Sequence, residues 1–461
     1  MKVVVFDDDP TGSQTVHSCP LLLAADAASL RQALAHPSPL LFVLANSRAL
    51  APEAARQRLS ALCRNLRQAL QALASVEPVV LVSRGDSTLR GHFPLELEVI
   101  EAEFGAADAR FLVPAFLPGG RTTVGGVHLL HGSPVHTSEF ARDRLFGYET
   151  SDLAAYIEAK SGGRVPASSV ERLCLAELDA AQHEAGFAAL CERLARLAPG
   201  AWVVVDAERP QQLSALGAAV RALMAPAAAE RWGRPRRFLF QSAASLLNGL
   251  VELGPQPRSG AELAALVRRD SQGKPLPALV LVGSHVPLAD AQLAHLLARE
   301  PACRLVEIAV AKLARVLEGP APAELLASLE AAWLEQLRAV LAAGQTPVLA
   351  SSRGELSCRS SEERRRLGLA LAALMARLVA ALAPGLGCVI SKGGITSHTL
   401  LESGLLCSAV ELQGQLLPGL SLVLTGPEAL VPGLPVLTFP GNLGEAQTLR
   451  QALLLLQGQG L

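Results

Sequence analysis

The chain has 461 residues, of which 50% are hydrophobic and 18% are charged, and its formal net charge is −1. This composition is typical of a well-buried globular protein and excludes a disordered one, and the length predicts two or three domains. Both charge signs are mixed along the chain, so we expect no nucleic-acid partner. The eight cysteines form no C-x-x-C pair, which argues against a zinc site and favours reduced core residues in a cytoplasmic protein.

The longest apolar run, residues 367–390, is long enough to raise the question of a membrane span. Arg377, Pro384 and two glycines interrupt it. We therefore interpret it as a buried helix followed by a strand, and we expect no membrane partner. The apolar residues 3–6 are too few for a signal peptide.

The first half alternates short apolar runs, which are typical of buried strands, with segments of helical pattern. Strands are expected at residues 3–6, 40–44, 78–82, 110–113 and 201–205, and helices at 52–73 and after Pro94. Several of these strands end in polar loops. Because ligands bind at the carboxyl ends of strands in open α/β sheets, these loops are the candidate site.

The first strand ends in three consecutive aspartates, Asp7, Asp8 and Asp9, followed by a Pro-x-Gly turn. Adjacent carboxylates repel one another, so a nearby cation or a positive group would relieve them. We expect the rim of an active site here. A solvated acidic turn is the alternative.

The third strand runs into a loop that carries charged and hydroxyl side chains, in the order Arg84, Asp86, Ser87, Thr88 and Arg90. The two arginines could fork a substrate carboxylate, and Asp86 could accept a proton from a substrate hydroxyl. An arginine–aspartate ion pair that pins the loop is the alternative for any one such pair.

An irregular polar stretch, residues 116–143, follows the fourth strand and includes Arg121. A long structured excursion inside a compact domain is often functional. Its three histidines lack the spacing of a helical metal-binding pair. Hydrogen-bonding roles are therefore favoured, and no protein metal site is predicted.

The second half begins after residues 254–277, which are rich in glycine and proline and so predict a domain boundary. A strand is expected at 278–282, and a strand at 347–350, a helix at 362–383 and a strand at 388–390 form one β-α-β unit. That unit predicts a parallel strand pair with a right-handed crossover. Glycine loops at 283, 393 and 441 can converge on one ligand at the edge of a sheet.

The stretch at 388–399 organises this second half. A strand passes into a Gly393-Gly394 loop, and Thr396 and Ser397 are expected to cap a helix at 399–405. Paired glycines let the backbone approach a ligand closely, and a helix N-terminus favours a phosphate, as does a lysine. The glycine spacing matches neither a Walker A loop nor a dinucleotide fingerprint. A tight turn that binds nothing is the alternative.

The alternation of strands and helices in both halves predicts an α/β protein with two doubly wound, Rossmann-like domains facing a central cleft. We place the N-terminal domain at residues 1–253, a linker at 254–277 and the C-terminal domain at 278–461. No internal repeat is evident in the sequence.

Several motifs, taken together, resemble those of the four-carbon acid sugar kinase family. They are the blocks at 8–12, 84–91, 120–124, 134–143, 283–284, 392–397 and 441–444. The Ser-Thr-Leu-Arg-Gly block and the Lys-Gly-Gly-Ile-Thr-Ser block, in this order, are specific as a pair. The chain departs from the family pattern at Pro10, Arg84, Gln241, Thr399 and Phe439.

The resemblance implies an N-terminal acid-sugar domain and a C-terminal ATP domain, with ATP and Mg²⁺ as cofactors. The candidate catalytic and substrate-binding residues are Asp8, Asp9, Arg84, Asp86, Ser87, Arg90 and Arg121. The candidate nucleotide-binding residues are Ser284, Lys392, Gly393, Gly394, Ile395, Thr396, Gly441 and Gly444.

The leading hypothesis is an ATP-dependent kinase that phosphorylates a hydroxyl of a sugar acid of the threonate, erythronate or 2-oxo-tetronate type. Asp86 is favoured as the catalytic base because neighbouring arginines would keep it ionised, and Asp8 would orient substrate hydroxyls. A nucleotide-binding regulatory protein that lacks catalysis is the alternative. A nicotinamide oxidoreductase is disfavoured because no G-x-G-x-x-G follows a strand. We allow for a homodimer.

Overall fold

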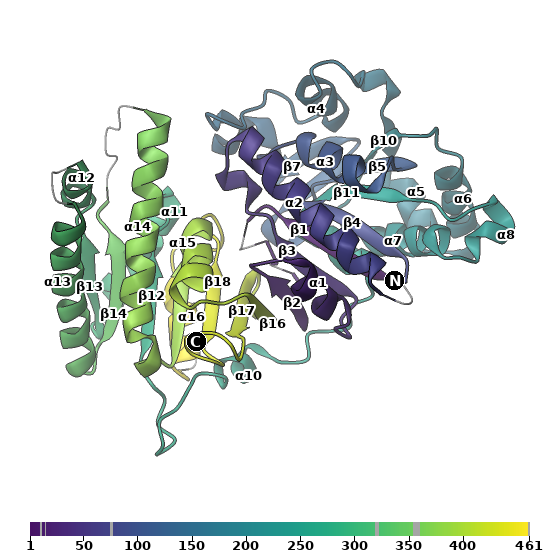
Figure 1. Cartoon of the computed structure of the whole chain (residues 1–461). Helices are drawn as coiled ribbons and strands as arrows, with labels where there is room; N and C mark the ends of the chain where they lie inside the picture. Colours follow the sequence, from purple (N-terminus) through teal and green to yellow (C-terminus); the bar gives the residue numbers. More distant parts are fainter. Residues whose placement is uncertain (10–11, 14, 74–76, 319–321, 354–359, 460–461) are drawn as a thin grey trace. The chain divides into compact units, whose positions relative to one another are not determined.

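The computed structural model describes residues 1–461 except 10–11, 14, 74–76, 319–321, 354–359 and 460–461 (Figure 1). Part of the first family-like block, Pro10 and Thr11, thus lies outside the described residues. The chain divides into two compact units, Met1–Pro255 and Gln256–Leu461. The division falls inside the region predicted as a linker, and most of that region goes with the second unit, where Gly260–Ala264 forms helix α10.

A parallel sheet forms the centre of the first unit, in the order β2-β3-β1-β4-β11-β5-β10-β9. Its strands are β1 (Lys2–Asp7), β2 (Cys19–Leu22), β3 (Leu40–Leu44), β4 (Val79–Arg84), β5 (Ala109–Val113), β9 (Glu171–Leu173), β10 (Ala201–Val205) and β11 (Phe238–Ser242). Parallel strands that are buried on both faces have nearly continuous apolar sequences. This is why the apolar runs of β1, β3 and β10 predict them well.

Helices cover both faces of this sheet. α1, α2 and α3 connect strands that step in one direction across the sheet, whereas α6 and α7 connect strands that step back. Because crossovers between parallel strands are right-handed, the two groups lie on opposite faces, which is the predicted doubly wound arrangement. The helices are α1 (Ala27–Leu34), α2 (Pro52–Gln71), α3 (Leu95–Phe104), α4 (Leu153–Lys160), α5 (Leu175–Ala180), α6 (Glu184–Ala195), α7 (Pro210–Met224), α8 (Ala228–Trp232) and α9 (Ala244–Leu250).

The irregular stretch after β5 forms a small antiparallel sheet of β6 (Arg121–Val124), β7 (Val127–Leu130) and β8 (Ser133–Pro134). Asp206, directly after β10, fixes the turn between β6 and β7. Its carboxylate accepts from the backbone N–H groups of Gly125 and Gly126, each at 2.8 Å. The excursion is therefore anchored at the carboxyl edge of the large sheet.

The second unit is built on a sheet in the order β13-β14-β12-β15-β18-β17-β16. The strands from β13 to β18 in this order are parallel, and β17 is antiparallel to β18 and β16. The strands are β12 (Ala278–Val282), β13 (Cys303–Ile308), β14 (Thr346–Ser351), β15 (Cys388–Lys392), β16 (Ala409–Leu417), β17 (Leu420–Thr425) and β18 (Pro435–Phe439).

The predicted pairing of the β-α-β unit in this half is wrong in one respect. β14 and β15 are parallel, but β12 lies between them and pairs with both. The crossover helix α14 therefore passes over one strand, and the sequence of a crossover does not say how many strands it passes. The helices of this unit are α10, α11 (Pro287–Arg299), α12 (Val310–Glu318), α13 (Pro322–Ala342), α14 (Ser361–Leu382), α15 (Gly394–Thr399) and α16 (Thr448–Leu456).

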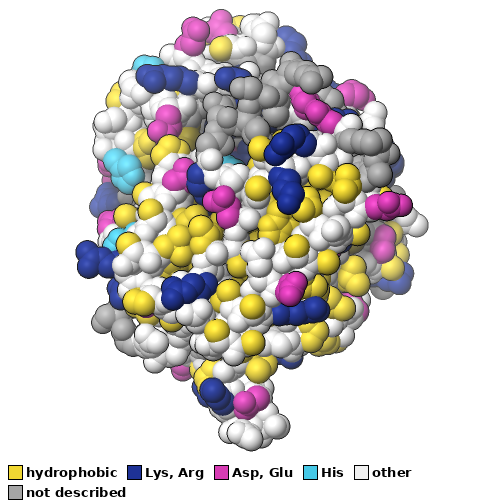
Figure 2. All heavy atoms as spheres, turned by 90° about the vertical axis from the view of Figure 1, so that its left-hand side faces the viewer, with side chains coloured by type: hydrophobic (Ala, Val, Ile, Leu, Met, Phe, Trp, Pro, Cys, Tyr) yellow, Lys and Arg dark blue, Asp and Glu magenta, His cyan; other side chains and the backbone are white. Residues whose placement is uncertain are grey.

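Helix α14 is apolar and long. The stretch Arg366–Gly385 has a mean hydropathy of 1.9 and could cross a membrane by length and composition alone, but half of it is buried inside the protein. Leu374, Leu378 and Val379 are fully buried, and β15 follows the helix, so the predicted buried helix and strand are confirmed. Figure 2 shows the face of the second unit that carries α12 and α13, where charged side chains are interspersed with apolar ones.

Candidate functional site

The carboxyl ends of β1 and β4 bring together two of the polar stretches that the sequence singles out. Asp7 and Arg84 are the last residues of these strands and lie in register with each other. The backbone N–H of Asp8 donates to the carbonyl of Arg84 at 3.1 Å. The two stretches meet because neighbouring parallel strands end at the same edge of the sheet.

Arg84 lies between two aspartates. Its Nη1 is 3.6 Å from Oδ1 of Asp7 and 3.6 Å from Oδ1 of Asp8, and none of the three side chains is more than 5% exposed. Burial raises the pKa of Asp7 to about 7 and raises that of Asp8 well above its usual range, although Arg84 opposes both shifts. A Cβ on Gly12 would lie 2.0 Å from Oδ1 of Asp7, so a larger residue there would have to displace the Asp7 carboxylate. These contacts are those of an arginine that pairs with aspartates to hold the loop, which is the alternative to substrate binding for Arg84.

Asp86 is held by two arginines and a hydroxyl. Its Oδ2 accepts from Nε of Arg90 at 2.7 Å and from the hydroxyl of Thr88, and its Oδ1 lies 3.7 Å from Nη1 of Arg48. Burial alone would raise the pKa of Asp86, but Arg90, Arg48 and Thr88 outweigh burial and hold that pKa well below its usual range. Asp86 is therefore ionised at neutral pH.

Arg48 is a site residue that the sequence analysis missed. It lies on the 3₁₀ turn η1 (Ser47–Ala49), and its guanidinium pairs with Asp9 and lies 3.6 Å from Oδ2 of Asp8. With its contact to Asp86, it connects the aspartate turn to the loop after β4. A signal was available, because this polar turn directly follows a predicted strand, as the other two stretches do.

Arg90 and Arg121, the other predicted arginines, lie beside Asp86. The guanidinium of Arg90 is 4.8 Å from the centroid of the Phe140 ring, which is a cation–π contact. Arg121 donates from Nη1 to the carbonyl of Gly119 at 2.5 Å. Burial lowers the pKa of Arg121, and the attraction between its charge and that of Asp86 opposes that shift.

Successive carbonyls of the loop after β4 are held by ring donors from the segment between β5 and β9. The pairs are His128 Nε2 with Ser87 O at 2.8 Å, Tyr148 OH with Thr88 O at 2.6 Å, and Tyr156 OH with Leu89 O at 2.8 Å. We call His128, Tyr148 and Tyr156 the ring clamp. Within the clamped loop Leu89 has a φ of +64°, which is uncommon for a residue other than glycine.

The histidine of the ring clamp is neutral. Burial lowers the pKa of His128 to about 4, so Nε2 donates to Ser87 and Nδ1 accepts from the Thr123 hydroxyl at 2.9 Å. Nδ1 of His136 lies 2.8 Å from the hydroxyl of Ser151. The predicted hydrogen-bonding roles are confirmed for these two histidines.

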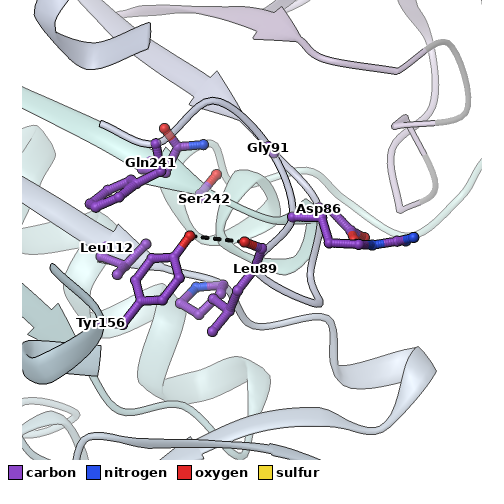
Figure 3. A pocket seen from close by; sticks show the side chains of 11 residues that line it. Asp86, Leu89, Gly91, Leu112, Tyr156, Gln241 and Ser242 are labelled. Carbon is purple, nitrogen blue, oxygen red and sulfur yellow. Dashed lines mark hydrogen bonds and ion pairs between the residues drawn. The ribbon is translucent and has the colours of Figure 1, made fainter. Parts of the chain in front are cut away.

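A pocket lies beside the clamped loop (Figure 3). Its volume is about 320 Å³, including solvent-filled space at its opening. Asp86 and Arg90 contribute charged groups to its lining, and Leu112 and Tyr156 contribute apolar surface. Gln241 and Ser242, at the end of β11, also line it. The pocket thus combines an ion pair with an apolar wall at the carboxyl edge of the sheet.

Glycine-containing loops of the second unit converge at the carboxyl edge of its sheet. A Cβ on Gly441 would lie 2.4 Å from Oγ of Ser284, and a Cβ on Gly393 would lie 3.2 Å from the backbone nitrogen of Ser284. A Cβ on Gly283 would lie 1.9 Å from Oγ1 of Thr396. The loops at 283, 393 and 441 therefore lie together at this edge, as predicted, and the glycines permit their close approach. Their convergence on one ligand stays a prediction.

The turn after β15 is tighter than predicted. Helix α15 begins at Gly394, so Gly393 alone, with a φ of +120°, forms the turn. Thr396 and Ser397 lie inside the helix and do not cap it. Helical structure continues from Thr399 into a π-helical turn at Leu400–Gly404, so most of the predicted helix at 399–405 is present, but it begins five residues earlier than predicted. The prediction is wrong because it took both glycines as loop, whereas the second adopts helical geometry.

Lys392 is enclosed by the protein. Its side chain is fully buried, its Nζ donates to the carbonyl of Pro440 at 2.9 Å, and Nζ lies 3.7 Å from the centroid of the Phe439 ring. Burial lowers its pKa to about 7. The ammonium thus ties β15 to the loop that carries Gly441.

Two other nucleotide candidates lie at the same edge in different settings. Ile395 is 47% exposed in the first turn of α15. Gly444 has a φ of +84° and precedes α16, whose first residue, Thr448, accepts from the backbone N–H of Glu445 at 2.8 Å. Arg353 was missed by the sequence analysis: it follows β14 and donates to the carbonyl of Ser284 at 2.6 Å.

The family models match both units. Residues 3–250 match a sugar-binding N-terminal domain, and residues 279–449 match a nucleotide-binding C-terminal domain. These matches define a protein that pairs a sugar-binding domain with a nucleotide-binding domain. The chain belongs to the four-carbon acid sugar kinase family, as its motifs predict.

Relatives with assigned activities cover nearly the whole chain. The D-erythronate kinase of Heliobacterium modesticaldum is 26% identical over 438 residues, which are 90% of this chain and 88% of that protein. The D-threonate kinase of Salmonella typhimurium is 27% identical over 470 residues and covers 98% of both chains.

Two solved structures have the same fold. A Salmonella typhimurium protein described as a putative tRNA synthase has a TM-score of 0.64 at 17% identity and covers 98% of both chains. A Haemophilus influenzae protein has a TM-score of 0.61 at 15% identity and covers 99% of this chain and 100% of its own. At this identity the likeness concerns the fold.

Proposed function

We propose that the protein is an ATP-dependent kinase that phosphorylates a hydroxyl of a four-carbon sugar acid of the threonate, erythronate or 2-oxo-tetronate type. The observation that carries the proposal is the cluster of aspartates and arginines at the carboxyl edge of the sugar-binding unit. Carboxylates accept hydrogen bonds from sugar hydroxyls, and arginines bind a carboxylate through paired donors. A hydroxylated acid needs both. The similarity to erythronate and threonate kinases supports the same class of substrate.

Asp86 is the proposed catalytic base. It is ionised at neutral pH, so it can accept the proton that the attacking hydroxyl releases. Its low basicity is compatible with phosphoryl transfer, whose transition state is loose and demands mainly positioning and charge neutralisation. Asp8 has a raised pKa and lies deeper, which suits a role in orienting substrate hydroxyls.

Arg90 is the proposed partner of the substrate carboxylate, because it lines the pocket and its side chain is 23% exposed. Arg84 and Arg48 each contact at least two aspartates, so we assign them the alignment of Asp8 and Asp9, whereas Arg90 pairs with Asp86 through Nε. Ser87, in the loop after β4, and Arg121, near Asp86, are the remaining proposed substrate-binding residues.

The converging glycine loops of the second unit fit a nucleotide phosphate. A Cβ on Gly393 or Gly441 would press on Ser284, and Gly393 turns the chain into the N-terminus of α15, which includes Gly394, Ile395 and Thr396. Lys392 is sealed beneath this surface, so we propose that it acts through the Gly441 loop. Bound ATP supplies the phosphoryl group.

Mg²⁺ would enter with the nucleotide. Among the described residues, no three or more His, Cys, Asp or Glu side chains are grouped so that they could hold a metal ion. Mg²⁺ typically keeps several waters and binds substrate phosphates with few protein ligands. Mg²⁺ bound to the ATP phosphates therefore fits the described residues better than Mg²⁺ held in a site made of protein ligands.

The test is an ADP-release assay of the full chain with Mg²⁺ and ATP over the D- and L-forms of threonate and erythronate and their 2-oxo relatives. Succinate, a four-carbon acid without a hydroxyl, is the matched control. We expect ADP release with at least one hydroxy acid and none with succinate. ATP binding by calorimetry without ADP release for any acid would instead support the regulatory alternative.

A further inference from the structure

The carboxyl end of β11 carries polar atoms that no described residue satisfies. Gln241 is 9% exposed and Ser242 is 3% exposed. The Gln241 amide oxygen, Oε1, and the Ser242 hydroxyl, Oγ, are buried and have no hydrogen-bond partner among the residues that the structure describes. Buried polar atoms are normally paired, so each such exception needs an explanation.

Both residues line the pocket beside the clamped loop (Figure 3). The backbone places them there: the N–H of Gly85 donates to the carbonyl of Ser242 at 2.8 Å, which joins the end of β11 to the start of the loop. Gln241 packs directly on Gly85, because a Cβ on that glycine would lie 2.6 Å from Nε2 of Gln241. The glutamine side chain thus fills the space that the glycine leaves open.

We infer that Gln241 and Ser242 form a subsite that hydrogen-bonds a hydroxyl of the sugar acid and sets which four-carbon acid the protein accepts. The inference rests on the proposed function and adds the residues that select the substrate. Nothing in the sequence motifs or in the similarity to known kinases assigns this role.

The chemistry of the two side chains favours a hydroxyl over a carboxylate. An amide oxygen accepts a hydrogen bond, and a serine hydroxyl can donate or accept one. A substrate hydroxyl can donate to the Gln241 amide oxygen, and the Ser242 hydroxyl can pair with a hydroxyl as donor or acceptor, whereas a carboxylate would be repelled by the amide oxygen. The carboxylate is better placed toward Arg90, the cationic residue that also lines the pocket. In this arrangement the carbon chain of the acid would extend from its carboxylate at Arg90 to a hydroxyl at the end of β11.

Such an arrangement discriminates between epimers. A site built to hydrogen-bond a hydroxyl rejects an analogue that lacks it, because its buried polar groups are then left unpaired. Threonate and erythronate differ in the configuration at one hydroxyl-bearing carbon. With the carboxylate at Arg90, the two epimers direct that hydroxyl differently, so the end of β11 would favour one of them.

The test compares wild type, Gln241→Leu and Ser242→Ala, with kcat and KM measured for each acid of the panel. Leucine keeps approximately the volume of glutamine and removes its polar atoms. Ser245→Ala is the matched control, because Ser245 is buried nearby but accepts from the backbone N–H of Leu117 at 3.0 Å. We expect Gln241→Leu to change the ratio of kcat/KM between the preferred epimer and the other by about tenfold or more. The control should leave that ratio unchanged.

A structural role for Gln241 predicts a different pattern. Because its Oε1 is unpaired without substrate, Gln241→Leu should unfold at a temperature no lower than wild type in the absence of ligand. A lowered unfolding temperature with an unchanged ratio would overturn the inference. So would unchanged ratios in both Gln241→Leu and Ser242→Ala. Failure of wild type to phosphorylate any acid would overturn the proposed function itself, which is a separate result.

Discussion

Replacing Lys392 with methionine should stabilise the protein at neutral pH and lose that benefit as the pH rises. The usual lysine pKa is 10.5, and burial lowers that of Lys392 to about 7. Between these pH values the unfolded chain holds one more proton than the folded chain, so the stability of wild type increases with pH. Below pH 7 the buried ammonium is charged, and its full desolvation cost is present.

The magnitude follows from the pKa difference. A shift from 10.5 to about 7 corresponds to roughly 5 kcal/mol of destabilisation at low pH. Methionine also removes the hydrogen bond to Pro440, which costs ~1–3 kcal/mol at every pH, but it keeps an apolar contact with the Phe439 ring. We therefore expect Lys392→Met to be more stable than wild type by roughly 2–4 kcal/mol at pH 6 and less stable by ~1–3 kcal/mol near pH 10.5.

The assay is urea denaturation of both proteins from pH 6 to pH 10.5, followed by circular dichroism, with the free energy of unfolding extrapolated to water. Groups that titrate in both proteins cancel in the difference. Lys312→Met, which removes an exposed ammonium on α12, controls for the loss of one positive charge. A difference that stays constant across this pH range would refute the argument, because it would mean that the folded state does not depress the pKa of Lys392.

Three further predictions concern the proposed active site. Asp86→Asn should lower kcat by ~10²–10⁴ while ATP affinity, measured by calorimetry, stays the same. Arg90→Ala should raise KM for the acid tenfold or more, since a charge-assisted hydrogen bond contributes roughly 1.5–3 kcal/mol. Gly393→Ala should weaken ATP binding, because its φ of +120° strains any side chain and its Cβ would lie 3.2 Å from the Ser284 nitrogen; Gly385→Ala, with nothing within 4 Å, is its control.

Each of these has a result that would count against it. An active Asp86→Asn beside an inactive Asp8→Asn would exchange the two roles. An unaltered KM in Arg90→Ala would make Arg90 a structural partner of Asp86. Equal ATP affinity in Gly393→Ala and Gly385→Ala would place the nucleotide elsewhere.

The sequence predicts the fold well where local composition alone determines the element. The strands at 40–44, 201–205 and 278–282 have the bounds that their apolar runs predict. β11 was missed because its five residues follow a basic, turn-rich segment. The positions of the aspartate turn and of the Arg84 loop were predictable for the same local reason, because each polar stretch directly ends a strand.

The remaining features depend on which distant segments meet. Arg48 becomes a site residue only because β3 pairs with β1, which brings η1 beside Asp8 and Asp9. The burial of Lys392 depends on the chain near Pro440, 48 residues further on. The local sequence pattern specifies neither of these partners. The phosphate-binding role of Lys392 therefore stays a prediction, and its burial could not be foreseen from the glycine-rich motif.

The ring clamp limits how far the substrate loop can be treated as a separable part. His128, Tyr148 and Tyr156 hold three consecutive peptide carbonyls of the loop, yet they lie 41, 60 and 67 residues along the chain from the groups they bind. If residues 85–91 were replaced by those of another family member, the new side chains would therefore lack the backbone contacts that orient them in their own protein. A successful graft would need to carry the segment from β6 through α4 as well, because the loop and the ring clamp have to be transferred together. Protein engineers who seek a new acid specificity here should expect single changes at the end of β11 to be tolerated better than exchanges of the loop.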